Sequence, residues 1–289
     1  MSIADTSRAT EYQRLVEDEW TDAAVVAAWR RWHPKMAIQL AALTAALLEA
    51  ARVRPGLEIL DLASGTGLPA IDLARAIGPG GRVTATDLSA GMLAVAEEQA
   101  AAAGVANLAF RQADAQRLPF ADAAFDRVTS RIGAMYFVDI RGALGEIRRV
   151  LKPGGRVALA AWGPVERGTY AASLIGPFLR RLAPPPPPPD APQPLRFAAE
   201  GALGGELERA GFGDVEEIHR VIPVPWPGSA EELWQHFYDI AVPFHPLFDG
   251  LPPAERAEAI AEVAALLRAH DDGGAVRTTS AIVVASGVR

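Results

Sequence analysis

Between Leu57 and Trp162 the sequence alternates short apolar runs with longer stretches of helical pattern, and no other feature constrains the fold as strongly. The runs have the length of strands, and the stretches between them have the length of helices. A chain that repeats strand, helix, strand forms right-handed crossovers, which place parallel strands in one sheet with helices on both faces. The sequence therefore predicts an α/β fold of the doubly wound, Rossmann-like type. The expected strands are Leu57–Ala63, Arg82–Asp87, Leu108–Ala113, Phe125–Ser130 and Arg156–Trp162, and the expected helices are Leu68–Ile77, Ala90–Ala103 and Ile140–Leu151.

The segments before and after this core are predicted to be largely helical. From Trp29 to Leu47, apolar residues recur at steps of three or four, which places them on one helix face. Pro34 should divide this region into two helices with a bend at His33–Pro34, because the residue before a proline disfavours the α conformation. Later helices are expected at Gly168–Leu182, Ala198–Ala210, Glu231–Val242 and Pro253–Ala269, strands at Val215–Val224 and Val276–Ser286, and breaks at Lys152–Gly155 and Pro225–Pro227.

These patterns divide the chain into four expected parts. They are an N-terminal helical segment that covers the active site (1–54), an alternating core (55–163), an insertion with a proline-rich connector (164–198) and a C-terminal part of the sheet (199–289). The long stretch between the last two expected strands, at about residues 228–274, favours a helical lid. The run Pro184–Pro189 predicts a stiff polyproline II connector, with an SH3-like protein partner as the alternative.

Composition and charge narrow the classes of function. Lys and Arg total 28 against 35 Asp and Glu, so the chain of 289 residues has a formal net charge of −7, which disfavours nucleic acid as the main partner. The absence of cysteine excludes disulfides, thiolate nucleophiles, cysteine-ligated zinc and iron–sulfur clusters. The uncharged stretch Met36–Leu48 is shorter than the roughly 20 residues that span a bilayer. We expect a cytoplasmic chain without a membrane span, and we expect no metal site.

A glycine-containing turn follows the first expected strand, in the segment Glu58–Gly67. Gly65 and Gly67 allow a tight turn and the close approach of a ligand. A dinucleotide-binding loop would have three glycines in the order G-x-G-x-x-G, and this loop lacks the third. Asp61, at the end of the strand, would repel a pyrophosphate and suits an ammonium group or another cation. These features disfavour a nicotinamide-dependent oxidoreductase.

Two further carboxylates follow neighbouring strands. Asp87 closes the second expected strand, and a carboxylate there can accept hydrogen bonds from both hydroxyls of a ribose. Asp114 follows the third strand and can accept a hydrogen bond from an adenine amino group. With Asp61 they lie at the carboxyl ends of the strands, where open α/β sheets bind ligands. The implied ligand has a ribose, an adenine and a positive charge but no pyrophosphate, and S-adenosylmethionine fits this description.

The segments that carry these residues resemble one known family. They are Leu60–Gly67, Thr86–Ser89, Ala113–Ala115, Leu118–Phe120, Phe125–Asp126 and Glu146–Gly155. Over about residues 53–163 the chain resembles the class I S-adenosylmethionine-dependent methyltransferases, on the branch of the ubiquinone/menaquinone-biosynthesis C-methyltransferases. The resemblance implies a seven-stranded sheet of order 3-2-1-4-5-7-6 with an antiparallel last strand, N-terminal helices and a helical cap.

The resemblance also assigns contacts with the cofactor. The methionine end would be wrapped by Ala63, Ser64, Gly65 and Gly67, with Asp61 under the amino group; Asp87 would hold the ribose, Leu88 and Met92 would pack on the adenine, Asp114 and Ala115 would bind the adenine edge, and Arg131 would face the cofactor or the substrate. Ala63 departs from the glycine that is commonest at its position. Asp126 is interpreted as structural.

Catalytic residues are the least determined part of the prediction, because the cofactor carries the reactive methyl group and the protein supplies orientation and a dry pocket. His33 is the first candidate for a general base, since a bend at Pro34 could direct it toward the cofactor. Tyr136 follows the fourth strand and is a candidate pocket residue, and His236 and His245 are weaker candidates. Aromatic residues outside the sheet, such as Phe237, predict either a cap core or a hydrophobic acceptor pocket.

We therefore expect a methyltransferase that acts on a small hydrophobic or aromatic acceptor, by C- or O-methylation of a quinone-like or polyketide-like ring. A homodimer belongs to this expectation. Two alternatives stay open: a protein of this fold that binds S-adenosylmethionine but catalyses a reaction other than methylation, such as a cyclisation or decarboxylation, and a non-enzymatic binding module. Fold-level analogy does not decide between acceptors.

Overall fold

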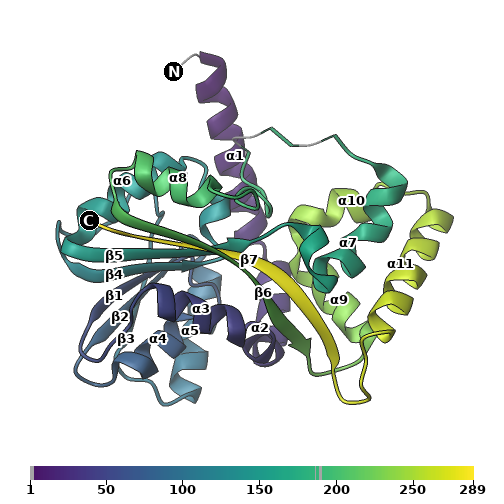
Figure 1. The fold of residues 1–289 in the computed structure, drawn as a ribbon, viewed down its shortest axis with the longest axis horizontal. Helices are drawn as coiled ribbons and strands as arrows, with labels where there is room; N and C mark the ends of the chain where they lie inside the picture. Colours follow the sequence, from purple (N-terminus) through teal and green to yellow (C-terminus); the bar gives the residue numbers. More distant parts are fainter. Residues whose placement is uncertain (1–2, 186, 189–190) are drawn as a thin grey trace.

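The computed structural model describes residues 3–185, 187–188 and 191–289. Its centre is one seven-stranded sheet of order β3-β2-β1-β4-β5-β7-β6, in which β7 is antiparallel to both of its neighbours (Figure 1). The predicted sheet order and the antiparallel last strand are confirmed. The strands are β1 Glu58–Leu62, β2 Arg82–Asp87, β3 Leu108–Gln112, β4 Phe125–Arg131, β5 Leu151–Trp162, β6 Gly213–Trp226 and β7 Val276–Val288.

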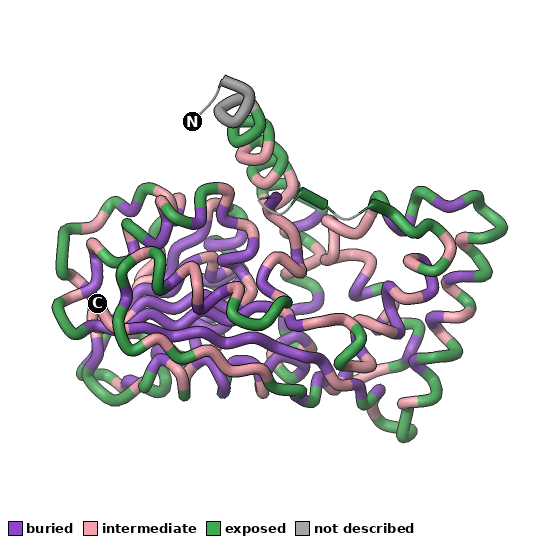
Figure 2. The backbone as a smooth tube through the Cα atoms, turned by 45° about the horizontal axis from the view of Figure 1, so that its top comes forward, coloured by how far each residue is buried: buried purple, intermediate pink, exposed green. Residues whose placement is uncertain are grey.

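Helices cover both faces of the sheet, and the central strands are buried along their length (Figures 1 and 2). One face carries α3, whose apolar residues pack on β5, β6 and β7, and α4, whose apolar residues pack on β1 and β2; the opposite face carries α6 and α8. The α-helices are α1 Ile3–Thr21, α2 Ala23–Gln39, α3 Ala41–Ala50, α4 Ala70–Ile77, α5 Ala90–Ala102, α6 Ile140–Val150, α7 Thr169–Leu182, α8 Ala202–Arg209, α9 Ala230–Ile240, α10 His245–Asp249 and α11 Pro253–Arg268. Short 3₁₀ helices lie at η1 Ala134–Tyr136, η2 Val165–Arg167 and η3 Val242–Phe244.

The expected bend at His33–Pro34 is wrong, because α2 continues through Pro34. The helix begins after Asp22, whose carboxylate accepts hydrogen bonds from the backbone of Ala24 and Val25 at 2.8 and 3.1 Å, and it ends at Gln39. A proline inside a helix removes one hydrogen bond and crowds the preceding turn. The buried side chains of α2 on both sides of the proline include Trp32 and Met36, so packing against the cap outweighs the local preference.

Two expected breaks also lie inside strands. Lys152–Gly155 forms a bulge in β5 rather than a turn before it, because Leu151 pairs with Phe125 and Arg156 pairs with Arg127. Gly154 has φ +76°, which a glycine adopts without strain. The break expected at Pro225–Pro227 begins later, since Pro225 and Trp226 belong to β6. A strand at the edge of a sheet tolerates proline, because one row of its backbone groups has no ladder partner.

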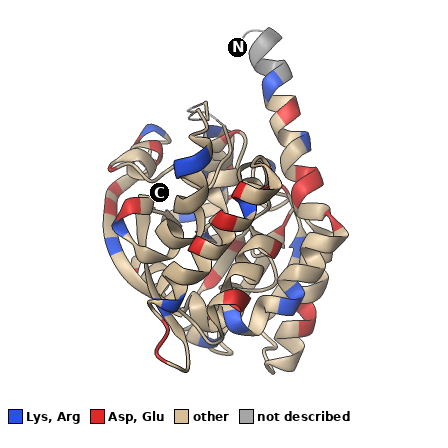
Figure 3. Ribbon diagram, turned by 90° about the vertical axis from the view of Figure 1, so that its right-hand side faces the viewer, with Lys and Arg blue, Asp and Glu red and all other residues tan. Residues whose placement is uncertain are grey.

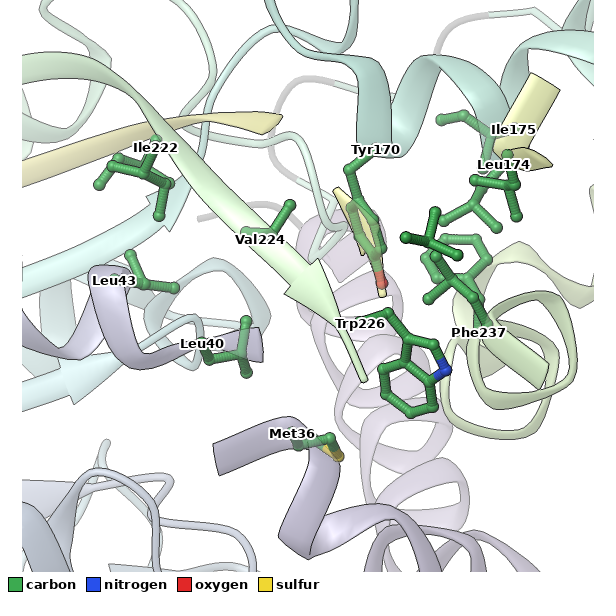
Figure 4. Packing of buried hydrophobic residues seen from close by; sticks show 14 of the residues in the cluster. Met36, Leu40, Leu43, Tyr170, Leu174, Ile175, Ile222, Val224, Trp226 and Phe237 are labelled. Atoms are coloured by element: carbon green, nitrogen blue, oxygen red, sulfur yellow. The ribbon is translucent and has the colours of Figure 1, made fainter. Parts of the chain in front are cut away.

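A helical cap stands at the end of β6 and β7, which extend beyond the other strands (Figure 1). Helices α7, α9, α10 and α11 form it, and α10 was not predicted from the sequence. Figure 4 shows how Tyr170 of α7, Trp226 of β6, Phe237 of α9 and Met36 of α2 face one another in its core. Phe178 and Phe248 are fully buried in the same cluster. The cap is therefore built on the sheet by shared apolar packing.

Other features of the chain have no effect on the position of the site. The predicted polyproline segment Pro184–Pro189 falls partly on residues 186 and 189, which lie outside the described residues. Within the described ranges, none of the helices combines the length and apolar character needed to cross a membrane. Basic and acidic residues are interspersed along the ribbon in Figure 3. The four-part division remains a prediction.

Candidate functional site

The loop between β1 and α4 adopts the conformation that its glycines allow. Gly65 and Gly67 have φ +53° and +99°, and Ala63 has φ +52°. A Cβ atom at Gly67 would lie 3.1 Å from the Ile71 side chain and 3.3 Å from the backbone of Ala96, so this glycine lets α4 and α5 approach each other. Ala63 adopts a left-handed conformation that costs energy for a residue with a side chain, which gives a physical reason for the glycine common at this position.

Asp87 joins this loop to the end of β2. One carboxylate oxygen accepts a hydrogen bond from the backbone of Gly65 at 2.8 Å, and the other accepts one from the backbone of Ser89 at 2.9 Å. Burial raises the pKa of Asp87, and these hydrogen bonds oppose the rise. The side chain also lines the cavity described below. Asp87 is thus held in one orientation, with lone pairs on both oxygens left for a ligand.

Asp61 lies deeper than the prediction of a ligand contact implies. Its side chain is fully buried, and its carboxylate accepts hydrogen bonds from the hydroxyls of Ser64 at 2.7 Å and Thr129 at 2.6 Å. Burial raises the pKa of Asp61 to about 6, against the effect of these bonds and of the Arg131 charge. Asp61 is not among the residues that line the cavity. Its carboxylate instead orders the loop, through the hydrogen bonds of Ser64 and Thr129.

A cavity of about 210 Å³ opens at the carboxyl ends of β1, β2 and β4. Its wall brings together most of the residues assigned to the cofactor: Ala63, Ser64, Gly65, Asp87, Leu88, Met92, Asp114, Ala115 and Arg131. We call this part of the wall the cofactor half. Gly67 and Asp61 lie outside the wall, where they shape the loop instead. Tyr136, in η1, lines the cavity as expected.

The same cavity continues into the cap, and we call this part the cap half. It is lined by Met36, Gln39, Leu40, Trp162, Tyr170, Ala171, Ile175, Phe237, Ile240, Phe244 and Ser280. The pocket interpretation of the aromatic residues therefore agrees with the positions of Phe237 and Phe244, although both also pack in the cap core. Sequence reasoning missed Gln39, Trp162 and Tyr170. The position of Trp162 at the carboxyl end of β5 was a usable signal, because β5 lies beside β4.

The N-terminal helices cover the cofactor half. Gln116 bonds through its side-chain amide to the carboxylate of Asp114 and to Gln13 of α1, at 3.1 and 3.0 Å. Arg30 of α2 forms an ion pair with Glu98 of α5. Trp29 lies 3.9 Å from the position that a Cβ atom of Gly65 would take. These contacts hold α1 and α2 against the loops that carry the acidic residues.

Arg131 is a buried cation at the end of β4. Its guanidinium donates hydrogen bonds to the Thr44 hydroxyl at 2.8 Å and to the Leu68 carbonyl at 3.2 Å. Burial lowers its pKa to about 10, so the side chain stays charged at neutral pH. Its Nε atom has no hydrogen-bond partner within the described part of the chain. Arg131 thus offers a positive charge and a free donor at the cavity wall.

The three histidines considered as bases lie outside the cavity wall. His33 is buried and shares a hydrogen bond of 3.0 Å with the Thr66 hydroxyl. His236 stacks on Trp226, with ring centroids 4.3 Å apart, and His245 bonds to the carbonyl of Tyr238 at 2.8 Å. The hypothesis that His33 reaches the reacting groups depended on a bend that the helix does not have. These histidines pack the helices together.

Replacing His33 by glutamine is expected to flatten the pH dependence of stability without moving the pH profile of turnover. Burial and the Arg131 charge lower the pKa of His33 to about 4. The unfolded chain takes up this proton near pH 6.5, so protonation favours unfolding as the pH falls from there toward 4. Urea unfolding should show that the free energy of unfolding falls less between about pH 7.5 and about pH 5 in the variant than in the unmodified chain. An equally steep loss would contradict the assignment.

The comparisons with known proteins agree with this geometry. The model of the ubiE/COQ5 methyltransferase family matches residues 39–171. The ubiquinone/menaquinone biosynthesis C-methyltransferase UbiE of Cellvibrio japonicus is 35% identical over 185 residues, which cover 58% of this chain and 72% of that protein. The chain belongs to the ubiE/COQ5 methyltransferase family. The class I resemblance expected from the sequence is thereby confirmed.

Two further similarities extend over most of the chain. Nocamycin O-methyltransferase of Saccharothrix syringae is 29% identical over 254 residues, which cover 83% of this chain and 88% of that protein. The crystal structure of the YcgJ protein of Bacillus subtilis is 21% identical and superimposes with a TM-score of 0.54, covering 85% of this chain and 97% of that one. The second similarity shows that the fold is shared.

S-adenosylmethionine is the cofactor of this methyltransferase, as predicted. The cofactor half fits it chemically. The carboxylates of Asp87 and Asp114 suit hydroxyl and amino donors, and Leu88 and Met92 offer apolar surface for a flat base. The loop around Gly65 brings backbone close to the cavity. The negative charges of Asp87 and Asp114 also complement a cationic sulfonium, whereas they would repel the pyrophosphate of a dinucleotide.

Proposed function

We propose that the chain transfers a methyl group from S-adenosylmethionine to a small hydrophobic acceptor, by C- or O-methylation of a quinone-like or polyketide-like ring. One observation carries this proposal: the cofactor half and the cap half form a single cavity. A ligand held by Asp87 and Asp114 would therefore share one enclosed space with a molecule held among Tyr170, Phe237 and Phe244. A cavity of this kind excludes water and brings two reactants together.

The chain's own residues would position both ligands. Asp87 would hold the ribose hydroxyls, and Asp114 the adenine amino group, while Leu88 and Met92 pack on the base. The bound cofactor supplies an electrophilic methyl group on a positively charged sulfur. Helices α1 and α2 would close this half through the contacts of Gln13 and Arg30. The aromatic wall of the cap would orient the acceptor.

The relatives support a small-molecule acceptor. The names of the two curated relatives describe one protein of ubiquinone and menaquinone biosynthesis and one nocamycin O-methyltransferase. Neither name decides the acceptor of this chain, and it is the largely apolar wall of the cap half that favours a hydrophobic ring. Homodimer formation and a cytoplasmic location remain predictions from the sequence.

Filling the cap half should separate acceptor binding from cofactor binding. Ala171 lines the cavity on α7, and Ala171→Phe is expected to lower methyl transfer to ring acceptors at least about tenfold, because the added ring occupies acceptor space. The affinity for S-adenosylmethionine should stay within about twofold, since Asp87 and Asp114 lie in the other half. Transfer of labelled methyl groups and calorimetric titration measure the two effects.

The matched control is Ala172→Phe. Ala172 neighbours Ala171 on the same helix but is not part of the cavity wall, so this variant should keep both methyl transfer and the affinity for S-adenosylmethionine. Loss of cofactor affinity in Ala171→Phe alone would contradict the division of the cavity into two halves. Absence of methyl transfer by the unmodified chain to any ring acceptor, with the cofactor bound, would reject the proposed acceptor class.

A further inference from the structure

Two indole groups of the N-terminal helices lack hydrogen-bond partners at the cavity wall. The Nε1 atoms of Trp20 in α1 and Trp29 in α2 are buried, and neither finds an acceptor within the described residues. Both residues line the cavity. A buried donor without an acceptor is costly, and native structures usually provide one. An N–H group donates and cannot accept, so the missing partner must be an acceptor atom.

The two rings lie beside the cofactor loop and the segment that follows β4. The Trp20 ring contacts the rings of Tyr136 and Trp29 edge to face, with centroid distances of 5.2 and 5.9 Å, respectively. Trp29 lies against the Gly65 loop, and Tyr136 follows the end of β4. The two rings thus lie between the cofactor loop and the segment that follows β4, where an acceptor would meet the transferred methyl group.

The cap half of the cavity is lined by no carboxylate and no histidine among the described residues. The carboxylates of the wall, Asp87 and Asp114, both lie in the cofactor half, where backbone groups and Gln116 donate hydrogen bonds to them. No histidine of the described chain belongs to the wall. The wall therefore offers donors and one cation but no group placed to remove a proton from the acceptor.

The tyrosines of the wall do not supply the base either. Burial raises the pKa of Tyr136 and of Tyr170, so both hydroxyls stay protonated and act as donors at neutral pH. The Glu19 carboxylate adds to the rise at Tyr136, and burial raises the pKa of Glu19 itself to about 7. Glu19 lies on α1 outside the cavity wall. Arg131 is the one cation among the described residues that line the cavity.

We propose that the acceptor carries an oxygen that is already ionised before it binds, such as an enolate or an acidic ring hydroxyl, and that the indole N–H groups of Trp20 and Trp29 bind this oxygen. The inference rests on the proposed function and narrows its acceptor class. For transfer to oxygen, a lone pair of the anion forms the new O–C bond while the C–S bond breaks and its electrons stay on sulfur. The acceptor and the sulfur both end neutral, so no proton needs to be removed.

Matched probes test the proposal by binding, without turnover. The protein is saturated with S-adenosylhomocysteine near neutral pH, and two naphthoquinones are titrated by calorimetry: 2-hydroxy-1,4-naphthoquinone, which is ionised, and 2-methyl-1,4-naphthoquinone, which is neutral. The chain has no cysteine, so the quinones cannot be trapped by a thiol. The ionised probe is expected to bind at least about tenfold more tightly, because a hydrogen bond to a charged group is stronger than one to a neutral group.

Variants that replace the indole by a smaller ring without an N–H group locate the effect. Trp20→Phe and Trp29→Phe should each reduce the preference for the ionised probe several-fold, and should leave the affinity for S-adenosylhomocysteine and for the neutral probe nearly unchanged. Trp234→Phe is the control and should keep the preference, since Trp234 lies outside the cavity wall and its nitrogen is not among the buried atoms without a partner.

The outcomes separate this inference from the proposed function. Failure of the unmodified chain to bind S-adenosylhomocysteine would reject the proposed function. Binding of S-adenosylhomocysteine without a preference for the ionised probe would overturn the inference alone, and this comparison needs no variant. A preference that survives in both Trp20→Phe and Trp29→Phe would also overturn it, as would a loss confined to S-adenosylhomocysteine, which would assign the indoles to the cofactor.

Discussion

Replacement of Asp87 by asparagine is expected to lower the affinity for S-adenosylmethionine by at least about 100-fold. The carboxylate accepts backbone hydrogen bonds from Gly65 and Ser89 and would accept those of the ribose hydroxyls. An amide has one oxygen, so its NH₂ group must face either a backbone donor or a ribose hydroxyl. Hydrogen bonds to a charged group contribute roughly 1.5–3 kcal/mol each, and a 100-fold loss corresponds to about 2.7 kcal/mol. Calorimetric titration with S-adenosylmethionine and S-adenosylhomocysteine measures the change.

A second aspartate at a strand end provides the matched control. Asp126, at the opposite end of the sheet, accepts hydrogen bonds from the backbone of Glu58 at 2.9 Å and from Lys152 at 2.9 Å. Asp126→Asn should leave cofactor affinity unchanged and lower stability modestly, in line with its interpretation as a structural residue. Equal loss of affinity in both variants would mean that Asp87 acts on the fold and not on the ligand.

Replacement of Gly133 by alanine is expected to destabilise the fold by about 2 kcal/mol and to disturb the cofactor loop. A Cβ atom at Gly133 would lie 2.4 Å from the Ala63 side chain and 2.7 Å from the Ser130 hydroxyl. Overpacking of this kind typically costs about 1–3 kcal/mol. Ala63 already holds a left-handed conformation, so it cannot yield without changing the loop. Affinity for S-adenosylhomocysteine should therefore fall together with the free energy of unfolding, which urea titration measures.

Gly145 is the control for Gly133→Ala. It lies in the interior of α6, is exposed, and has no atom within 4 Å of its potential Cβ position. Alanine there should stabilise the protein by up to about 1 kcal/mol, because glycine is unfavourable in a helix, and cofactor affinity should not change. If Gly133→Ala proved as stable as Gly145→Ala, the close approach of β4 to the loop would be refuted.

The strands that surround the cofactor loop were predicted well because their signals are local. Arg82–Asp87 was predicted to the residue, and Phe125–Ser130 ends one residue earlier than β4. A buried parallel strand needs a short apolar run, and its position is set by the turn residues on both sides. The course of α2 through Pro34 could not be predicted in this way. It depends on Trp32 and Met36 finding partners in the cap, which lies far away in the sequence.

The residues of the site also differ in whether local sequence signals could identify them. Asp87, Asp114 and Ala115 were placed at the cavity because a residue just after a parallel strand must lie at the sheet's ligand edge. Asp61 also lies at a strand end, but it does not line the cavity, since its carboxylate accepts hydrogen bonds from Ser64 and Thr129. The hypothesis that His33 acts as a base relied on a bend at Pro34 that α2 does not have, and His33 lies outside the cavity wall. Trp20 and Gln39 had no local signal, and only the packing of the N-terminal helices brings them to the cavity wall.

The sequence by itself determined the order of strands and helices, the loop that meets the cofactor and the carboxylates beside it. These features depend on backbone conformation and on spacing within about 30 residues, which the chain encodes directly. Only the tertiary structure decided which aromatic residues form the cap half, which carboxylates are already engaged and which donors remain free. Those properties depend on contacts between residues that are far apart in the sequence, such as Trp29 with Gly65 and Trp32 with Trp226. The sequence around one residue of such a pair does not indicate which residue it will contact.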